Sequence, residues 1–380
     1  MRGELLLTNA RVVTRHAVVP GTLRAVEGKI VDVSPGPTAA AGATDLDGDL
    51  LLPGLVELHT DVLEKHLTPR PGVRWPVAAA VLAYDAQLAA AGITTVLDSL
   101  AVGYLVDGGQ RPRDPRPMVE ALRAGREAGA LRCDHHLHLR CEVGTETVVR
   151  DFEPFVEDPA LRLVSLMDHA PGQRQFVSLD KYREYNQGKY GFSDAQMDAV
   201  IAERLSDHAR FADAHRAAVI ALCQKHGLRL ASHDDATAAH VEQAAEIGSV
   251  IAEFPTTLEA ARAARVWGLA IMVGAPNLVR GASHSGNVSA VDLVARDLVD
   301  ILSSDYVPAA ALHGAWLLHA RYGAALHDAV ATVTAAPAER VGLDDRGEIL
   351  SGRRADLLRV ALHGEVPTIR SVWRNGERIA

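Results

Sequence analysis

The chain has little cysteine, few aromatic residues and no long apolar run, and each shortage excludes a class of protein. Three of its 380 residues are cysteines, and no two of them form a Cys-x-x-Cys pair, so a disulfide framework is excluded and a reducing compartment is favoured. No signal-peptide core follows Met1, and no apolar run reaches the ~18 residues of a membrane span. We therefore expect a cytoplasmic protein without a membrane partner.

Positive charge is also scarce relative to negative charge. The net charge is −9 at pH 7, whereas a general nucleic-acid binder needs surplus lysine and arginine for phosphate contacts. We expect no nucleic-acid partner, but a small anionic substrate remains compatible because a site can be locally basic or hold metal. With 48% hydrophobic and 23% charged residues, the composition suits a globular protein with one large domain and a smaller one. It leaves open whether the chain forms a homo-oligomer.

Short β-type runs separated by turns occupy both ends of the chain. Residues 1–52 contain several such runs, with turns at Gly28 and Gly48, and residues 340–380 return to the same pattern. We expect these two segments to form one small β-sandwich domain. The segment between them, 53–339, is organised differently.

This middle segment alternates apolar runs with alanine-rich helical patterns, which is typical of βα units. We expect helices over 76–91, 116–129, 236–247, 257–267 and 288–300. The expected strands are 55–61, 92–99, 133–142, 161–169, 228–234, 247–255, 268–275 and 300–306. The pattern predicts an α/β fold with a (β/α)8 TIM-like barrel of the metal-dependent hydrolase type. An open doubly wound sheet is the main alternative, but no Gly-x-Gly-x-x-Gly motif follows any of the runs.

The connection after the fourth strand is long and opens with an aromatic-rich insertion at about 170–192. A helix is expected to follow it, from Asp194 to His226. Long insertions at a barrel mouth often act as lids, and a small satellite core that ties the insertion down is the alternative. The chain is 4% aromatic, yet this short insertion gathers Tyr182, Tyr185, Tyr190 and Phe192.

Acidic and histidine side chains lie at the ends of the predicted strands. Side chains two apart on a strand point to the same face. Glu57, His59 and Asp61 should therefore share the face that lines the barrel, and Val56 and Leu58 the helix-covered face. The same alternation brings further metal-binding groups to the carboxyl-terminal rim, where barrel active sites form. These are Glu142, His169, His233 and Asp305.

The mixture of imidazole and carboxylate groups is typical of a divalent transition-metal site. We expect His59, Asp61 and Asp305 to hold one ion. A second ion would be held by His169 and His233, with Glu142 as the bridging carboxylate. Zinc is the expected metal, as one or two ions, and manganese or iron are the alternatives.

The expected metal supplies a nucleophilic hydroxide near neutral pH, and Asp305 is expected to take the proton from the attacking water. Each residue also has a simpler explanation. A strand-end histidine is often structural, Asp305 is placed to cap the following helix, and Glu142 to pair with Arg140. Their convergence on one rim favours the metal site. His136 and His138 lie deeper on the same face and are expected to support it.

Three loops on the same rim are rich in cationic, hydroxyl and glycine residues, the groups that bind phosphate oxygens. They follow the first, fourth and seventh strands. Ordinary turn chemistry with solvated charge is the alternative for any single residue, but the three loops together favour an anion site. The expected substrate-binding residues are Lys65, His66, Arg70, Arg174, Arg280, Ser283, His284, Ser285 and Asn287.

The chain resembles the amidohydrolase superfamily over nearly its full length. The resemblance includes the strand that leads to His59, the position of Asp305 and a closing signature over 334–357. Within the superfamily the chain is more similar to the family of α-D-ribose 1-methylphosphonate 5-triphosphate diphosphatases of the carbon–phosphorus lyase pathway. The motifs of this closer resemblance are His59-Thr60-Asp61, Glu64-Lys65-His66, Pro69-Arg70-Pro71, 168–175, 232–235 and 303–306.

The resemblance implies a metal-dependent enzyme of phosphonate catabolism that hydrolyses a ribose 5-triphosphate to the 5-phosphate and pyrophosphate. Its partner would be a small phosphorylated ribose, attacked at the phosphorus nearest the ribose, and the basic loops would hold the departing phosphates. The sequence departs from the superfamily pattern at Asp61, where a second histidine is usual, and at the sixth strand, which ends in Glu253. His66 and Glu253 are candidates for the missing ligand.

Two other functions are compatible with a barrel of this kind. A hydrolase of cyclic amides or N-acyl compounds would use the same ligands, because metal-activated water attacks carbonyl carbon as well as phosphorus. The basic rim disfavours neutral amides as substrates. A catalytically silent barrel that serves as a scaffold would lack ligands at its strand ends, and here these positions are filled.

Overall fold

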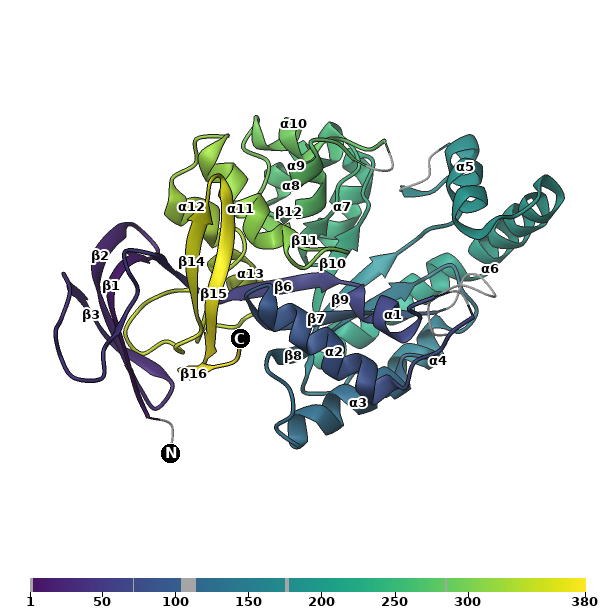
Figure 1. Ribbon diagram of the computed structural model, residues 1–380. Coiled ribbons are helices and arrows are strands. Elements are labelled where there is room, and N and C mark those ends of the chain that lie inside the picture. The colour runs from purple at the N-terminus through teal and green to yellow at the C-terminus, as the bar shows by residue number, and fades with distance from the viewer. Residues whose placement is uncertain (1–2, 71, 104–113, 175–177, 284–285) are drawn as a thin grey trace.

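The computed structural model describes residues 3–70, 72–103, 114–174, 178–283 and 286–380. In these ranges the chain forms a parallel barrel surrounded by helices, with a second sheet beside it (Figure 1). The predicted fold, a TIM-like barrel with a small β domain from both termini, is therefore confirmed. The predicted domain boundaries after residues 52 and 339 stay a prediction.

The barrel contains the parallel strands β6 to β13, which follow one another around the ring in chain order. A parallel bridge between Thr60 and Asp305 joins the first strand to the segment after the last one and closes the ring. All strands except β7 lie within the apolar runs predicted for them. The bounds are β6 Leu55–Thr60, β7 Ile93–Val102, β8 Asp134–Glu142, β9 Leu161–Met167, β10 Arg229–His233, β11 Ser249–Glu253, β12 Ala270–Gly274 and β13 Ile301–Ser303.

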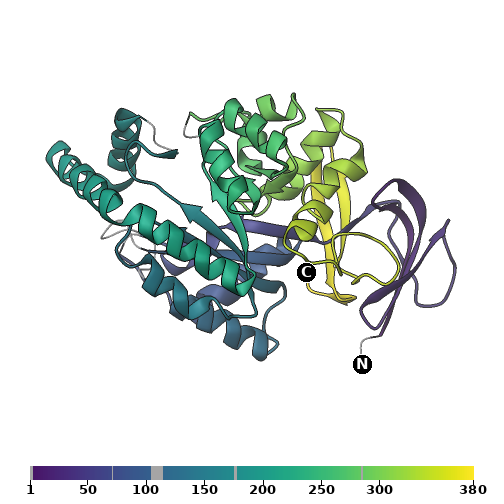
Figure 2. The same cartoon turned by 180° about the vertical axis from the view of Figure 1, so that it is seen from behind.

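Helices between the strands cover the outside of the barrel (Figure 2). The helices predicted over 76–91, 116–129, 236–247 and 257–267 correspond to α2, α3, α7 and α8. The helix predicted over 288–300 ends early, because Asp297 has a left-handed backbone (φ 56°) that turns the chain toward β13. The bounds are α1 Val62–Leu67, α2 Val77–Ala90, α3 Arg116–Glu127, α4 Val148–Phe152, η1 Glu153–Phe155, α7 Ala238–Glu246, α8 Leu258–Trp267, α9 Ala275–Arg280, α10 Ala290–Val294, α11 Ala310–Ala320, α12 Leu326–Ala331 and α13 Ala335–Arg340.

The second sheet is built from both ends of the chain. Strand β5 Leu50–Pro53 pairs with β1 on one side and with β14 on the other, so the two terminal segments share one sheet. The remaining bounds are β1 Glu4–Val13, β2 Val18–Val26, β3 Lys29–Pro35, β4 Thr44–Asp45, β14 Leu357–His363, β15 Val366–Arg374 and β16 Glu377–Arg378. Because β6 begins directly after β5, this sheet anchors the strand that leads into the barrel mouth.

The insertion after β9 contains the helices α5 Leu179–Tyr190 and α6 Asp194–His226, which project from the barrel in Figure 1. Helix α6 has the predicted bounds, since Ser193 caps its first turn and Gly227 ends it in a left-handed conformation. Tyr182 and Met197 form a small separate core between the two helices, which is the satellite-core alternative. Movement of the insertion as a lid stays a prediction. Among the described helices, α6 included, none combines the length and apolar character that a membrane crossing requires.

A buried polar network fixes α2 against the barrel wall. The ring of His135 on β8 lies 2.9 Å from Asp98 on β7 and 3.2 Å from Asp85 on α2. Asp85 also accepts hydrogen bonds from the backbone N–H groups of Arg132 and Cys133. Burial opposes protonation of His135, but the two carboxylates outweigh burial and raise its pKa to about 9. At neutral pH the imidazole is therefore a cation between two anions.

We predict that the free energy of unfolding decreases as the pH rises from about 6.5 to about 9. A histidine whose pKa is raised by folding contributes fully below its unfolded pKa, and the contribution is lost as the pH passes its folded value. The loss should be on the order of 3 kcal/mol. Urea unfolding across this pH range, with His135→Gln as the comparison, measures it. An unchanged pH dependence in the variant would contradict this assignment.

Candidate active site and metal centre

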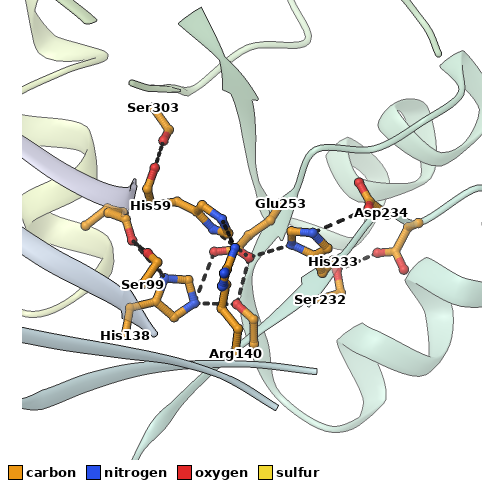
Figure 3. A network of polar contacts seen from close by, with 12 residues as sticks. His59, Ser99, His138, Arg140, Ser232, His233, Asp234, Glu253 and Ser303 are labelled. Atoms are coloured by element: carbon orange, nitrogen blue, oxygen red, sulfur yellow. Dashed lines mark hydrogen bonds and ion pairs between the residues drawn. The ribbon is translucent and has the colours of Figure 1, made fainter. Parts of the chain in front are cut away.

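The carboxyl ends of the barrel strands bring histidine, acidic and arginine side chains into one mouth. His59 from β6, His138 and Arg140 from β8, His233 from β10 and Glu253 from β11 converge there (Figure 3). All five side chains are buried. Residues that are far apart in the sequence thus share one polar site at the rim where the sequence predicts it.

An inner cluster, formed by His59, His138 and Glu253, surrounds the Glu253 carboxylate. Its oxygens lie 3.4 Å from His59 Nδ1 and 3.5 Å from His138 Nε2. His233 Nδ1 lies 3.0 Å away, and Ser165 donates a hydrogen bond of 2.7 Å. Burial raises the pKa of Glu253, but these neighbours outweigh it and keep the pKa well below its usual value. Burial lowers the pKa of His138 to about 3, so this imidazole is neutral, as a metal ligand must be.

An outer cluster is formed by His169, His233 and Asp234. One Asp234 oxygen lies 3.7 Å from His169 Nε2 and 3.4 Å from His233 Nε2. His169 Nδ1 lies 2.6 Å from Glu142, which also accepts a hydrogen bond of 2.9 Å from the His169 backbone N–H. Glu142 therefore orients the ring so that Nε2 faces Asp234, an arrangement common for metal-binding histidines. Burial opposes the charged form of His169, but Glu142 and Asp234 raise its pKa to about 9.

Both clusters fit a divalent cation. In each of them, the three potential ligand atoms lie within 4.8 Å of one another. In the described part of the chain, the buried atoms His59 Nδ1 and Glu253 Oε1 have no hydrogen-bond partner, and a cation would satisfy them. A third group, Asp85, Cys133 and His135, meets the same distance criterion. Its atoms already hold α2 in place, so it has a structural explanation.

Asp61 and Asp305 lie where the first and last strands of the barrel meet. Asp61 follows Thr60, which forms the closing bridge with Asp305. Burial and the negative charge of Asp61 raise the pKa of Asp305 to about 7. A carboxylate with this pKa can accept a proton from water near neutral pH. The N-cap of the following helix α11 is Ala309, so the capping explanation for Asp305 does not hold.

The carboxylate of Glu57 connects the same two strands. It accepts backbone hydrogen bonds of 2.7 Å from His59 and 2.6 Å from Ser304, and lies 2.8 Å from Ser303 Oγ. The Glu57 side chain is buried, so these contacts are shielded from water. They hold His59 in register with the loop that carries Asp305.

Strand alternation fails on the first barrel strand. Val56 and Leu58 belong to the apolar cluster inside the barrel, and the prediction that they lie on the helix-covered face is wrong. His59 nevertheless faces the interior, because the pairing of β6 with β7 shifts its register after Glu57. An irregular strand can thus direct two consecutive side chains inward.

Left-handed backbone conformations have a similar effect at other strand ends. Asp234, Phe254 and Asp305 have φ angles of 54°, 54° and 53°. Regular alternation would turn Asp234 away from its neighbour His233. The left-handed turn instead brings its carboxylate to the imidazoles of the outer cluster.

Among the predicted substrate-binding residues on the first and seventh loops, Lys65 lies beside the segment that carries Asp305. Lys65 donates a hydrogen bond of 3.0 Å to the carbonyl of Tyr306, and its ammonium group lies over the Tyr306 ring. Tyr306 is the residue after Asp305. The side chains of Arg70 and Arg280 are exposed. Ser283 and Asn287 are half-buried, and the predicted residues His284 and Ser285 lie outside the described residues.

His66 and Arg174 contact protein groups. His66 Nε2 lies 2.8 Å from the side-chain oxygen of Gln87 on α2. Arg174 is buried, forms an ion pair with Asp235 and donates to the carbonyl of His233. In this arrangement Arg174 holds the loop after β9 against the end of β10.

Three residues of the two clusters are not among the metal ligands that the sequence predicts first. His138 was expected to support the site, Glu253 was an alternative ligand, and Asp234 was not assigned a role. His138 could have been identified as a ligand because it lies on the same strand face as Glu142. Glu253 could have been identified because it ends the sixth strand. Asp234 depends on a local backbone conformation that alternation does not predict.

Several solved structures share the fold of this chain. The chain matches an N-acetyl-D-glucosamine-6-phosphate deacetylase from Mycobacterium smegmatis with a TM-score of 0.64 and 18% identity, over 99% of this chain and 100% of that chain. It matches a 5-methylcytosine deaminase from Klebsiella pneumoniae with a TM-score of 0.65 and 16% identity, over 99% and 97%. A structure described as an amidohydrolase matches with a TM-score of 0.63 and 16% identity over 99% and 98% of the two chains. At these identities the likeness shows the fold that the chain shares with the three structures.

A curated relative identifies the family more narrowly. The α-D-ribose 1-methylphosphonate 5-triphosphate diphosphatase of Escherichia coli strain K12 is 46% identical over 379 residues, which cover 99% of this chain and 100% of the relative. The chain belongs to this diphosphatase family. A dihydroorotase of Methanopyrus kandleri is 35% identical over 94 residues, 20% of this chain and 22% of that protein. No family model matches the chain.

We predict that Glu57→Gln lowers the free energy of unfolding by about 2 kcal/mol, because an amide nitrogen would face a backbone N–H in a buried position. Chemical denaturation measures the change. Glu203→Gln, an exposed carboxylate on α6, is the control and should leave the midpoint unchanged. Equal midpoints for the two variants would rule out a contribution of Glu57 to barrel closure.

We predict that Asp234→Asn weakens binding of a divalent metal about 10-fold or more, because it removes a charged ligand of the outer cluster. Metal content after dialysis against a metal buffer measures the effect. The matched control is Asp235→Asn, since the Asp235 carboxylate is paired with Arg174 and Ser232, and this variant should retain its metal. Full metal content in Asp234→Asn would exclude that residue as a ligand.

Proposed function

We propose that the protein hydrolyses α-D-ribose 1-methylphosphonate 5-triphosphate to the 5-phosphate and pyrophosphate, in the breakdown of phosphonates. The single observation that carries this proposal is the 46% identity to the Escherichia coli diphosphatase over 99% of the chain. The local matches to enzymes of other names cover a quarter of the chain or less, so they carry no argument for a different substrate. The substrate is thus a small phosphorylated ribose, and a cytoplasmic location without nucleic-acid or membrane partners is part of the proposal.

The residues of the mouth fit a divalent metal as cofactor, with zinc as the first choice and manganese or iron as alternatives. When bound, such an ion polarises phosphoryl oxygens and lowers the pKa of water. His169, His233 and Asp234 would hold one ion, supported by the orientation that Glu142 gives to His169. The inner cluster, with Asp61 and Asp305 beside it, is the candidate for a second ion.

The position and the pKa of Asp305 support a role as general base. Its carboxylate lies in the mouth near Asp61, and burial with that neighbour raises its pKa to about 7. In the proposed reaction, water forms a P–O bond to the phosphorus nearest the ribose. The bond from this phosphorus to the oxygen bridging to the next phosphorus breaks, and its electron pair leaves with pyrophosphate. Asp305 accepts the proton that the water gives up.

The exposed cations of the rim are suited to hold the two outer phosphates. Lys65, Arg70 and Arg280 are exposed and belong to the loops that follow the first and seventh barrel strands, and charge-assisted hydrogen bonds from such groups to phosphate oxygens are strong. Ser283 and Asn287 add neutral donors on the seventh loop, and His284 and Ser285 belong to the same proposed group. For His66 and Arg174, contacts with Gln87 and Asp235 support a role in holding the rim loops.

Phosphorus NMR of the purified protein with a 5-triphosphoribosyl substrate tests the reaction. In water labelled with ¹⁸O, the label should appear in the ribose 5-phosphate and not in pyrophosphate, because the proposed attack occurs at the phosphorus nearest the ribose. Release of inorganic phosphate from the terminal position would contradict the proposed cleavage. Chelation of divalent metals should abolish turnover, and added metal should restore it.

We predict that Asp305→Asn lowers kcat by about 10²-fold or more while leaving the fold intact, because the amide cannot accept the proton. Steady-state pyrophosphate release measures the change, and circular dichroism checks the fold. Asp292→Asn on the exposed side of α10 is a matched control that should keep full turnover. Full activity of Asp305→Asn would remove this residue from the mechanism.

A further inference from the structure

Arg140 is a buried cation in the mouth that the metal site does not require. Its side chain is 4% exposed and comes from β8, between His138 and Glu142. Nη1 lies 3.4 Å from His59 Nε2, and Nη2 lies 3.3 Å from a Glu64 oxygen. Figure 3 shows the Arg140 side chain among His59, His138, His233 and Glu253 at the barrel mouth.

The position of this guanidinium is unusual for a site that attracts cations. Arg140 lies next to His59, a candidate metal ligand, and its positive charge acts on Asp305. A fixed positive charge beside a divalent ion is repelled by it. The repulsion is relieved when an anion lies between them. Glu64 provides a counter-charge in the free protein, and an anionic substrate would bring another to the side of the metal site.

We propose that Arg140 is a catalytic residue that binds a non-bridging oxygen of the phosphoryl group under attack. This inference rests on the proposed phosphoanhydride hydrolysis. In such a reaction, negative charge is spread over the three equatorial oxygens of the phosphorus in the transition state. A planar guanidinium can donate two parallel hydrogen bonds to such oxygens.

Replacing Arg140 is expected to affect kcat more strongly than replacing an exposed cation of the rim. The rim residues are proposed to hold the two outer phosphates, so they would act on substrate binding and on the charge that develops on the departing pyrophosphate. Arg140 is buried among the groups that perform the chemistry, where a preorganised donor has its largest effect on kcat. Amide hydrolysis would develop charge on a single oxygen, whereas the two-pronged donor matches a phosphoryl group.

The test compares Arg140→Lys with the unaltered enzyme by steady-state pyrophosphate release and by metal content. We expect kcat to fall about 10²-fold or more, with a smaller change in KM and with metal content unchanged. Arg346→Lys is the matched control. Arg346 is also a buried arginine, but it pairs with Asp134 and Asp345 at the opposite end of β8, so its replacement should leave kcat unchanged.

Chemical rescue separates contact with substrate from a structural role. In Arg140→Ala, added guanidinium ion should restore turnover at least about 10-fold, because it can take the vacated place beside the phosphoryl group. A kcat within a few-fold of the unaltered enzyme in Arg140→Lys would overturn the proposal. Loss of metal in parallel with activity, or no rescue of a folded Arg140→Ala, would overturn it as well. If the unaltered enzyme releases no pyrophosphate, the proposed function itself fails, which the same assay shows first.

Discussion

The candidate site depends on how the first and last strands of the barrel are joined. Their backbones meet at the bridge between Thr60 and Asp305, and the Glu57 carboxylate adds contacts to His59, Ser303 and Ser304. A carboxylate in this position is costly to bury unless its oxygens are hydrogen-bonded. Because its partners belong to both strands, the carboxylate is satisfied only in the closed ring. Barrel closure and the placement of His59 and Asp305 are therefore one structural event.

Around this closure the site is organised in two layers with different chemistry. The inner cluster keeps Glu253 ionised among imidazoles, and its histidine His138 is neutral. The outer cluster instead holds His169 by Glu142 and presents it to Asp234. His233 of the outer cluster also contacts the inner cluster, because its two ring nitrogens face Asp234 and Glu253.

The fold was predictable from the sequence because apolar runs and helical patterns repeat with a regular spacing. The same regularity located His59, His169, His233 and Asp305 at one rim. The prediction failed where the backbone is irregular. The register shift on β6 turns Val56 and Leu58 inward. Left-handed residues at strand ends likewise change which side chains enter the mouth. Periodicity describes regular strands, and the functional ends of these strands are not regular.

The two partners of strand β5 are synthesised at different times. It pairs with β1, which is made early, and with β14, which is made near the end of the chain. Until residues 357–363 leave the ribosome, one edge of the strand that continues into β6 has no partner. Non-local pairing of this kind slows folding and exposes strand edges to other chains. The nascent protein therefore relies on its last segment to complete the sheet from which the strand that carries His59 continues.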